Sequence, residues 1–169
     1  RTAKTFSLAM QIAQEMGILN QGDLVVQTAG TLTGISGSTD LIKVGLVRKI
    51  VSRGISIGEI GVTGKARIIK NNLDISLICP GEILFVPKEL MKNIPLSKNI
   101  AGIVTNQNVN DVYALFNKNN KKISTICNLE NMDNHQISNG DLITLQLNEG
   151  VIYMGQIEDD DAIDKYKYV

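Results

Sequence analysis

The sequence predicts an α/β fold made of two consecutive domains. The first stretch reads as a helix, an apolar strand, a Gly/Thr/Ser-rich loop and a second strand, which is typical of a piece of an α/β sheet. Farther along, the pattern changes to short apolar strands separated by turns, with short helical segments among them. We therefore expect one domain over residues 1–47, a linker over 48–58, a second domain over 59–156 and an acidic tail over 157–169.

Within the first domain, apolar side chains at helical spacing predict a helix over residues 3–16 (Phe6, Met10, Ala13 and Met16). Gly17 can end this helix in a left-handed conformation. Strands are expected over residues 24–28 and 41–47. The first of them is apolar enough to be central in a sheet.

The linker is indicated by its glycines and by basic and hydroxyl side chains, which make it more polar than its neighbours. After it, apolar runs bounded by turn residues predict six strands, over residues 62–69, 83–86, 102–105, 123–127, 141–147 and 151–154. The last two are joined by Asn148, Glu149 and Gly150, a plausible hairpin turn. Helices are expected over residues 88–94 and 110–118, and Pro95 would end the earlier one.

Charge and composition exclude several classes of partner. Lys plus Arg equals Asp plus Glu, 17 of each, so we expect no bulk attraction to nucleic acid or to an anionic membrane. No apolar run reaches the roughly 20 residues that a membrane span needs. Cys79 and Cys127 lie in apolar surroundings and are interpreted as buried free thiols, which favours a cytoplasmic protein. Because the first residue is Arg1, we expect a piece of a longer protein.

The loop of the first domain carries a recognisable pair of strings. Residues 22–30 read GDLVVQTAG and residues 34–44 read GISGSTDLIKV. Together they resemble the end of the C-terminal α/β domain of the pyruvate kinase family, where the pattern is GDxVVxTAG followed by a loop ending GxTNxxKV. Asp40 stands where that family usually has Asn.

A second resemblance covers roughly residues 55–156. The pieces GKARII at 64–69, GEILFV at 81–86, AGIVT at 101–105 and the closing stretch 139–153 are similar, in order and spacing, to the mobile domain of phosphoenolpyruvate-utilising enzymes. This resemblance implies a swivelling β/β/α domain of the phosphohistidine type. Pyruvate kinases of some bacteria carry such a domain as a C-terminal extension, so the two resemblances support each other.

The chain departs from the second family where chemistry would occur. Active members read approximately TExGGxTSHAA, and their histidine becomes phosphorylated. Here Tyr113 stands at the histidine position, and Asn108 and Val109 replace the glycines. A phenol with a pKa near 10 cannot replace imidazole as a phosphoryl carrier at neutral pH. We therefore expect no catalytic residue in this chain, and Tyr113 is a degenerate phosphohistidine position.

The loop between the first two strands is the candidate binding site. Its glycines and hydroxyls offer the donors that an anion needs. The resemblance implies that this loop closes over a phosphorylated allosteric effector, through Thr33, Gly34, Ser36, Gly37, Ser38 and Thr39. The alternative is a solvated turn between two strands. His135, in a polar stretch without a second histidine or a cysteine nearby, is expected to be an exposed loop residue and not a metal ligand.

The family resemblance also implies what the parent protein does. A pyruvate kinase transfers phosphate from phosphoenolpyruvate to ADP in glycolysis, with Mg²⁺ and K⁺. Its catalytic barrel would lie upstream in the same chain, and the enzyme would be a homotetramer. The present segment would be regulatory or structural, with no cofactor of its own. The alternative is a phosphotransfer or interaction module of a phosphoenolpyruvate-utilising enzyme.

Overall fold

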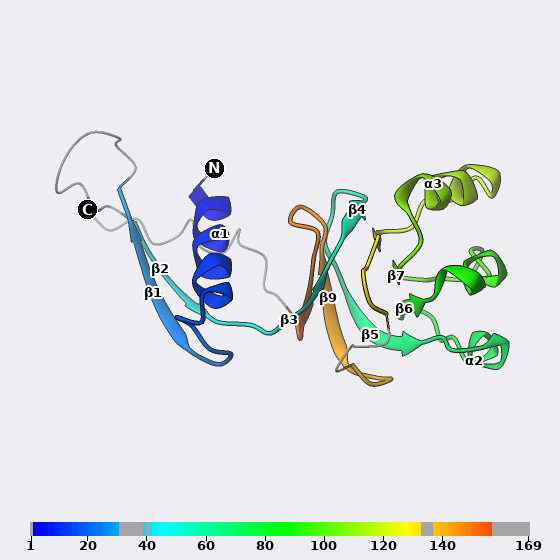
Figure 1. Cartoon of the computed structure of the whole chain (residues 1–169), viewed down its shortest axis with the longest axis horizontal. Helices are drawn as coiled ribbons and strands as arrows, with labels where there is room; N and C mark the ends of the chain where they lie inside the picture. Colours follow the sequence, from blue (N-terminus) through cyan, green and yellow to red (C-terminus); the bar gives the residue numbers. More distant parts are fainter. Residues whose placement is uncertain (1, 31–38, 40, 133–136, 157–169) are drawn as a thin grey trace. The chain divides into compact units, whose positions relative to one another are not determined.

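The computed structural model describes residues 2–30, 39, 41–132 and 137–156 (Figure 1). The chain divides into two compact units, and the division falls between Lys49 and Ile50. Both units combine helices with strands, so the predicted mixed α/β class is confirmed. None of the helices in the described ranges is long and apolar enough to cross a membrane.

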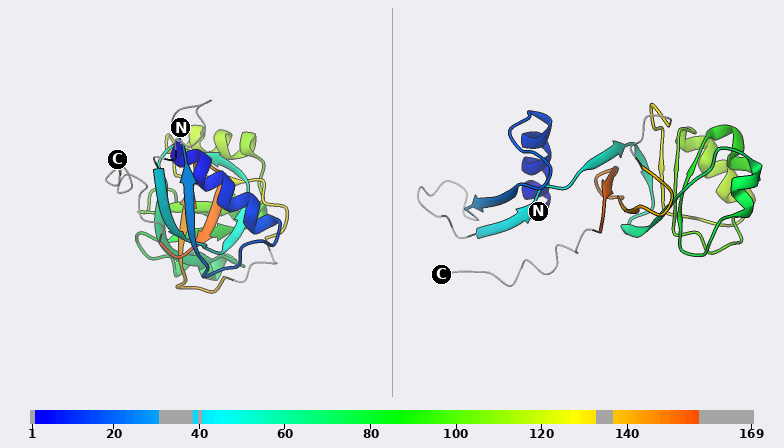
Figure 2. Two further views of the ribbon diagram at one scale, coloured as in Figure 1. Left: turned by 90° about the vertical axis from the view of Figure 1, so that its left-hand side faces the viewer. Right: turned by 90° about the horizontal axis from the view of Figure 1, so that it is seen from below.

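The first unit is a helix on a two-stranded sheet. It contains α1 (Thr2–Glu15), β1 (Leu24–Ala29) and β2 (Leu41–Leu46), and the two strands are antiparallel. Figure 2 shows α1 lying across one face of this pair. The side-chain amide of Gln27 donates to the backbone carbonyl of Phe6 over 2.8 Å and ties the sheet to the helix. Gly17 has φ of 72°, so the predicted left-handed end of the helix is confirmed.

The other face of this sheet is open in the described residues. Burial alternates along β1, so that Leu24 is 71% exposed and Val26 is 62% exposed. Their cross-strand partners Leu46 and Val44 are exposed as well. The prediction that the first strand is central in a sheet is therefore wrong for the described residues, because β1 pairs there with β2 alone.

In its described residues, the second unit has eight strands and three helical segments. The strands are β3 (Ile50–Arg53), β4 (Ile55–Ile57), β5 (Val62–Ile68), β6 (Ile83–Val86), β7 (Gly102–Thr105), β8 (Thr125–Cys127), β9 (Leu142–Gln146) and β10 (Val151–Met154). The helical segments are α2 (Asn72–Ser76), the 3₁₀ helix η1 (Lys88–Asn93) and α3 (Val109–Lys118). The sheet order is β3-β10-β9-β5-β6-β7-β8-β4, in which β5 to β8 run parallel and the other neighbours are antiparallel.

The sheet closes on itself at Gly54. Strands β3 and β4 stand at opposite ends of the order, yet they are consecutive in the chain and joined by this one glycine. The first half of the segment pairs with β10 and the second half pairs with β8. Residues 48–58, which were predicted as a linker, therefore contain two strands of the second unit.

The parallel strands separate two apolar cores. One core lies inside the closed sheet and contains Ile83, Phe85, Val104, Ile126, Leu145 and Ile152, among others. The other lies under the helical segments and contains Leu84, Val86, Met91, Ile103, Val112 and Phe116, among others. Successive residues of β6 enter alternate cores, as the period of a strand requires. The unit thus has a sheet that is buried on both sides along β6 and β7.

Candidate functional site at the carboxyl edge of the parallel strands

The carboxyl ends of the parallel strands β5, β6 and β7 meet at one edge of the second unit. In open α/β sheets, ligands bind in the crevice outside this edge. The segments that begin with Lys70, Lys88 and Asn106 leave the three strands there. This edge also holds the turn between β7 and α3, where the sequence predicted the degenerate phosphohistidine motif.

Two side chains fix the turn that follows β7. The Thr105 hydroxyl accepts a hydrogen bond from the backbone N–H of Gln107 over 3.1 Å. The Asn106 side-chain oxygen accepts from the backbone N–H of Lys88 over 2.8 Å and so joins this turn to the end of β6. These two hydrogen bonds hold the backbone just before Asn108 and Val109, the positions where the sequence comparison predicted a loss of glycines.

The N-terminus of α3 is capped from within the chain. Asn108 is the N-cap residue, and its side-chain oxygen accepts from the backbone N–H of Asp111 over 2.9 Å. The amide of Asn108 also donates to the Asp111 carboxylate over 2.5 Å. The carboxylate therefore lies at the positive end of the helix dipole, which is where a bound anion would be favoured.

A hollow of about 470 Å³ lies beside this turn. It is lined by Lys88, Glu89, Asn106, Gln107, Asn108 and Asp111. Two carboxylates oppose one ammonium group there, so the hollow has no excess of positive charge to hold a phosphate. Among the described residues, the buried Gln107 side-chain oxygen has no hydrogen-bond partner.

Tyr113 lies one helical turn farther along α3. Its side chain is 42% exposed, whereas the neighbouring Val112 is fully buried in the core under the helices. Tyr113 is not among the residues that line the hollow at the turn. The structure therefore brings Asn106, Asn108 and Asp111 together but leaves the tyrosine outside their group.

A second hollow, of about 760 Å³, opens at the ends of β5 and β6. Its buried apolar members are Ile69, Phe85 and Ile137. Two polar members are engaged by the backbone. Asn139 accepts from the N–H of Ile68 over 2.6 Å, and Asp74 accepts from the N–H of Lys70 over 2.7 Å. Lys70 and Ser138 also line this hollow, so polar and apolar side chains share its surface.

The predicted effector loop falls largely outside the described residues. Thr33, Gly34, Ser36, Gly37 and Ser38 belong to the undescribed range 31–38, and Thr39 is described only as exposed. His135 and the acidic residues of the tail lie outside the described ranges too. The effector site therefore stays a prediction.

The second unit contains an ion pair that the sequence did not predict. The Arg67 guanidinium on β5 lies 2.8 Å from the Glu82 carboxylate, and its Nε donates to both carboxylate oxygens. The backbone N–H of Cys79 also donates to Glu82 over 2.9 Å. Strand β6, the parallel neighbour of β5, begins directly after Glu82. Its predicted start is the one feature of the sequence that places Glu82 near β5.

Electrostatics favour the charged form of both partners. Burial by itself would raise the pKa of Glu82, but hydrogen bonds from Arg67 and Cys79 outweigh it and hold that pKa below its ordinary value. The hydrogen bond to Glu82 raises the pKa of Arg67. The pair lies at the amino end of β6, away from the carboxyl edge, and its role is structural.

The cysteines differ from the prediction in one respect. Cys127 is fully buried, as predicted, and burial raises the pKa of its thiol to about 12. Cys79 is exposed, so the prediction of two buried thiols is wrong for this residue. Cys79 lies in the turn that precedes β6, and its backbone N–H donates to the Glu82 carboxylate. Across the ranges that the structure describes, no three His, Cys, Asp or Glu side chains come together as metal ligands.

The sequence was compared with models of known protein families, and one family matches part of the chain. Residues 1–45 match the family model described as the pyruvate kinase, alpha/beta domain. They are the residues of α1, β1 and most of β2. The match thus falls on the first unit and leaves the second unit outside it.

The individual relatives are pyruvate kinases, and they match over both units. "Pyruvate kinase 2" of Synechocystis is 36% identical over 92% of this chain. The pyruvate kinase of Staphylococcus saprophyticus is 30% identical over 87%, and that of Geobacillus stearothermophilus is 28% identical over 91%. The chain spans about a quarter of the length of these relatives, from 25% to 26%.

Solved structures add nothing to this assignment. The microcin C7 self immunity protein MccF, in its inactive mutant apo state, aligns with 87% of this chain and 55% of its own chain. The identity is 13% and the TM-score is 0.39. A likeness at this level carries no argument about fold or function.

Proposed function

We propose that this chain is a regulatory and structural C-terminal part of a pyruvate kinase and carries out no chemistry itself. The observation that carries the proposal is the 36% identity to a pyruvate kinase over 92% of the chain, across both units. The parent would transfer phosphate from phosphoenolpyruvate to ADP, with Mg²⁺ and K⁺ bound in an upstream catalytic barrel. It would be a cytoplasmic homotetramer.

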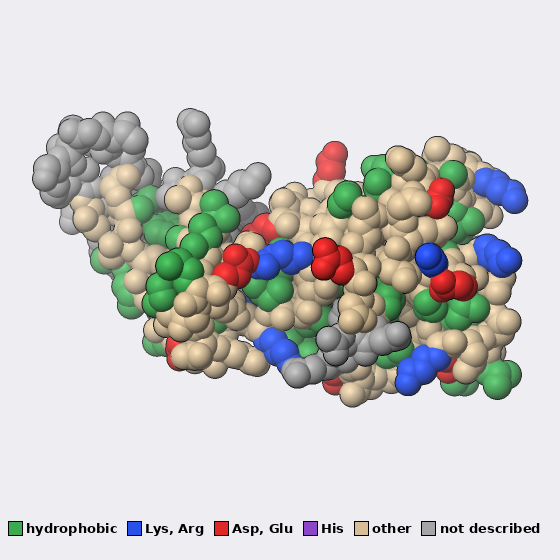
Figure 3. Space-filling model, in the orientation of Figure 1, with side chains coloured by type: hydrophobic (Ala, Val, Ile, Leu, Met, Phe, Trp, Pro, Cys, Tyr) green, Lys and Arg blue, Asp and Glu red, His purple; other side chains and the backbone are tan. Residues whose placement is uncertain are grey.

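The first unit would be the end of the effector-binding α/β domain. Its apolar surfaces support this assignment. Leu8 and Ile12 on α1 are 54% and 45% exposed, and Met16, directly after the helix, is 69% exposed. The outer face of β1 and β2 is apolar too, and hydrophobic side chains gather over this unit in Figure 3. Both surfaces would be covered by further layers of the same domain in the parent enzyme.

The second unit would be a swivelling domain that has lost phosphoryl transfer. Two cores on opposite sides of the parallel strands fit a β/β/α layering. Phosphoryl transfer needs cationic groups around the moving phosphate. At the β7–α3 turn, by contrast, Asp111 places a carboxylate at the helix N-terminus and Glu89 adds a second. Tyr113 lies on the exposed side of the helix.

Incubation with labelled phosphoenolpyruvate tests the non-catalytic assignment. We expect no protein-bound phosphate that is stable to base and labile to acid, the behaviour of phosphohistidine. Labelling of the protein would favour the alternative, a phosphotransfer module. His135 is the only histidine in the sequence, so His135→Gln is the control that identifies any labelled site.

A thermal-shift screen of the full-length parent enzyme tests the regulatory assignment. Sugar phosphates and nucleotides should be compared between the wild type and a variant with Ser36, Ser38 and Thr39 changed to Ala. A specific effector at a hundredfold excess over its Kd should stabilise the folded state by about 2.7 kcal/mol. The proposal requires this stabilisation to be lost in the variant while its melting temperature without ligand stays unchanged.

A further inference from the structure

Positive charge is concentrated on one stretch of the second unit. Between Glu89 and Glu130 the sequence contains five lysines and a single acidic residue, Asp111. The lysines are Lys92, Lys98, Lys118, Lys121 and Lys122, and all five are exposed. The Asp111 carboxylate is held at the N-terminus of α3 by Asn108, at the carboxyl edge of the sheet. It therefore lies away from the lysines that follow the other end of α3.

Four of these lysines lie at the opposite, amino edge of the parallel strands. One is in the turn before β7, and the other three end α3 and lead into β8. Strands β7 and β8 are parallel neighbours, and at their amino ends the N–H of Ile103 donates to the carbonyl of Ser124 over 2.9 Å. The two turns therefore lie side by side. We name their basic residues the lysine cluster: Lys98, Lys118, Lys121 and Lys122.

The end of α3 holds part of this cluster at the surface. Asn120 has φ of 48°, a left-handed conformation that ends the helix. The N–H of Lys121 donates to the carbonyl of Phe116 over 3.0 Å, the bond that closes such a helix end. Within the described ranges, no ammonium group of the cluster has a hydrogen bond or an ion pair with another residue. No described carboxylate therefore pairs with any of the four charges.

The other charged groups at this edge do not cancel the cluster. Glu82, at the amino end of β6, is paired with Arg67. Glu59 precedes β5, and Glu149 lies in the turn between β9 and β10, on the part of the edge that the closed sheet forms. Four lysines thus outnumber two unpaired glutamates among the described residues of this edge. The excess of positive charge falls on the helical side.

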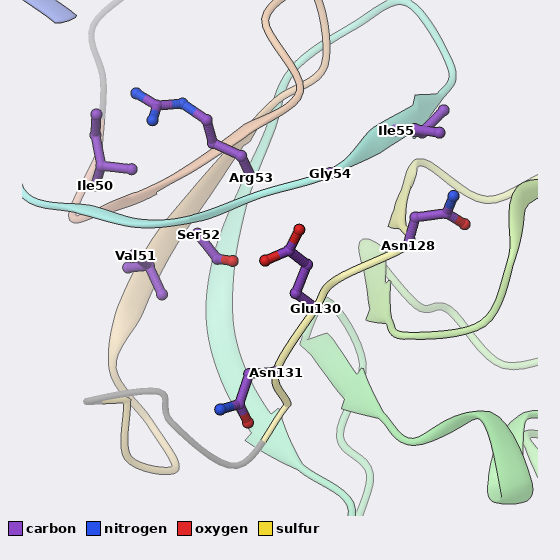
Figure 4. Close-up of a pocket in the computed structure, with 9 residues that line it drawn as sticks. All are labelled: Ile50, Val51, Ser52, Arg53, Gly54, Ile55, Asn128, Glu130 and Asn131. Carbon is purple, nitrogen blue, oxygen red and sulfur yellow. The ribbon is translucent and has the colours of Figure 1, made fainter. Parts of the chain in front are cut away.

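The hollow beside β3 differs from the lysine cluster in its charge. It has a volume of about 820 Å³, and its lining contains both Arg53 and Glu130 (Figure 4). One charge of each sign gives no net preference for the charge of a ligand. Charge therefore defines a partner at the lysine cluster and not at this hollow.

We propose that the lysine cluster is a docking surface for an acidic segment of another protein, a run that contains several aspartate or glutamate side chains. Ammonium groups and carboxylates form charge-assisted hydrogen bonds, which are stronger than neutral ones. Complementary charge also raises the rate at which two proteins associate. The proposal does not depend on the activity of the parent enzyme.

Two other anionic partners fit this surface less well. Surfaces that bind nucleic acid combine basic groups with arginine forks or with aromatic side chains on which bases stack. Residues 90–129 contain no arginine, and their exposed aromatic side chain is Tyr113 alone. Membrane surfaces are bound by basic residues together with apolar side chains that insert. Apart from Tyr113, no large hydrophobic side chain between Leu77 and Leu142 is exposed in the described residues.

The test measures binding of a short rhodamine-labelled peptide that alternates glutamate and serine to the full chain, by fluorescence anisotropy. The control peptide has glutamine in place of glutamate. We expect the glutamate peptide to bind at least about tenfold more tightly, and its affinity to fall as salt is added. Equal binding of the two peptides, or no binding of the glutamate peptide at millimolar concentration, would overturn the proposal.

Charge reversal of the protein tests the location. The double variant Lys121→Glu with Lys122→Glu should bind the glutamate peptide at least about tenfold more weakly than the wild type. The matched control is Lys70→Glu with Lys88→Glu, which makes the same charge change at exposed lysines of the carboxyl edge. The four residues of β7 span about 13 Å, which exceeds the Debye length of about 8 Å at physiological salt. The control should therefore keep the affinity of the wild type within about twofold.

An equal loss of binding in both double variants would show that the overall charge attracts the peptide, and the lysine cluster would not be the site. Thermal unfolding establishes that the variants are folded. The milder pair Lys121→Gln with Lys122→Gln serves if charge reversal prevents folding, and it should weaken binding in the same direction.

Three further results would contradict the choice of partner. A single-stranded oligonucleotide, or vesicles that contain phosphatidylserine, could bind more tightly than the glutamate peptide and lose that binding on charge reversal. Either result would identify a nucleic acid or a membrane as the occupant. Self-association of the chain that is lost on charge reversal, measured by sedimentation, would identify a second copy of the chain in place of another protein.

Discussion

Gly54 donates its backbone N–H to the carbonyl of Gly150 over 2.9 Å, and neither residue has space for a side chain. A Cβ on Gly54 would overlap the carbonyl oxygen of Cys127, and one on Gly150 would overlap the carbonyl of Gly54. Gly150 also has φ of 66°, which favours glycine. The two glycines let the β9–β10 turn approach the point where β3 becomes β4, so this contact closes the sheet.

Replacing Gly54 with alanine should therefore destabilise the second unit. The added methyl group meets backbone, which cannot yield as a flexible side chain would, and we expect a loss of about 2 kcal/mol or more in the free energy of unfolding. Urea unfolding followed by circular dichroism measures it. Gly45→Ala on β2 is the control, because the new Cβ would lie 3.5 Å from the Met10 sulfur, an ordinary contact. Equal stability of Gly54→Ala and the wild type would contradict the closure described above.

The ion pair between Arg67 and Glu82 predicts an acid-sensitive contribution to stability. The pKa of Glu82 is lowered from its ordinary value of 4.5, so the folded state favours the carboxylate. The contribution is fully present above pH 4.5 and is lost as the pH falls through the lowered folded-state pKa. Glu82→Gln should cost about 1–3 kcal/mol at neutral pH, because the Arg67 charge loses its partner.

The difference between the wild type and Glu82→Gln should then shrink as the pH is lowered. Urea unfolding at a series of pH values measures this convergence. Glu59→Gln, at an exposed residue of the same unit, controls for loss of one negative charge. A difference that stays constant from neutral to acidic pH would show that the charge of Glu82 does not contribute.

The cap of α3 predicts a smaller effect. Asn108→Ala removes the acceptor for the Asp111 backbone N–H and should cost about 1 kcal/mol. Asn108→Ser restores an oxygen acceptor and should recover most of that loss. Thermal unfolding of the two variants compares them. If the alanine and serine variants melt together below the wild type, the loss reflects the missing amide contact with Asp111 and not the cap.

The sequence anticipated most strands because their apolar runs are short and sharply bounded. The bounds of β6, β7 and β10 agree with the expected ranges, and α3 begins one residue before its prediction. These segments are strongly apolar or have one clear apolar face, so local pattern is enough to identify them. The turn at residues 148–150 was predicted for the same reason, since its glycine is conspicuous between two strands.

Elements that depend on distant contacts were missed. Arg53 and Gly54 make the segment of β3 and β4 look like a linker, and the two strands are recognised only by their pairing with β10 and β8. Helix α2 is five residues long and rests on a capping box between Asn71 and Asp74 rather than on apolar periodicity. The position of Tyr113 outside the hollow at the β7–α3 turn could not be predicted from the sequence. It depends on which side of α3 packs against the core.

The two cysteines give a direct test of the packing. Cys127 is fully buried on β8 and its pKa is raised to about 12 by burial, whereas Cys79 is exposed. Because the thiolate is the reactive form, a disulfide reagent at pH 8 should modify Cys79 rapidly and Cys127 only on unfolding. We expect one reactive thiol in the native chain and both in denaturant, with Cys79→Ser abolishing the native reaction. Rapid native labelling of Cys127 in that variant would show that the core between β4 and β7 opens far more readily than its packing implies.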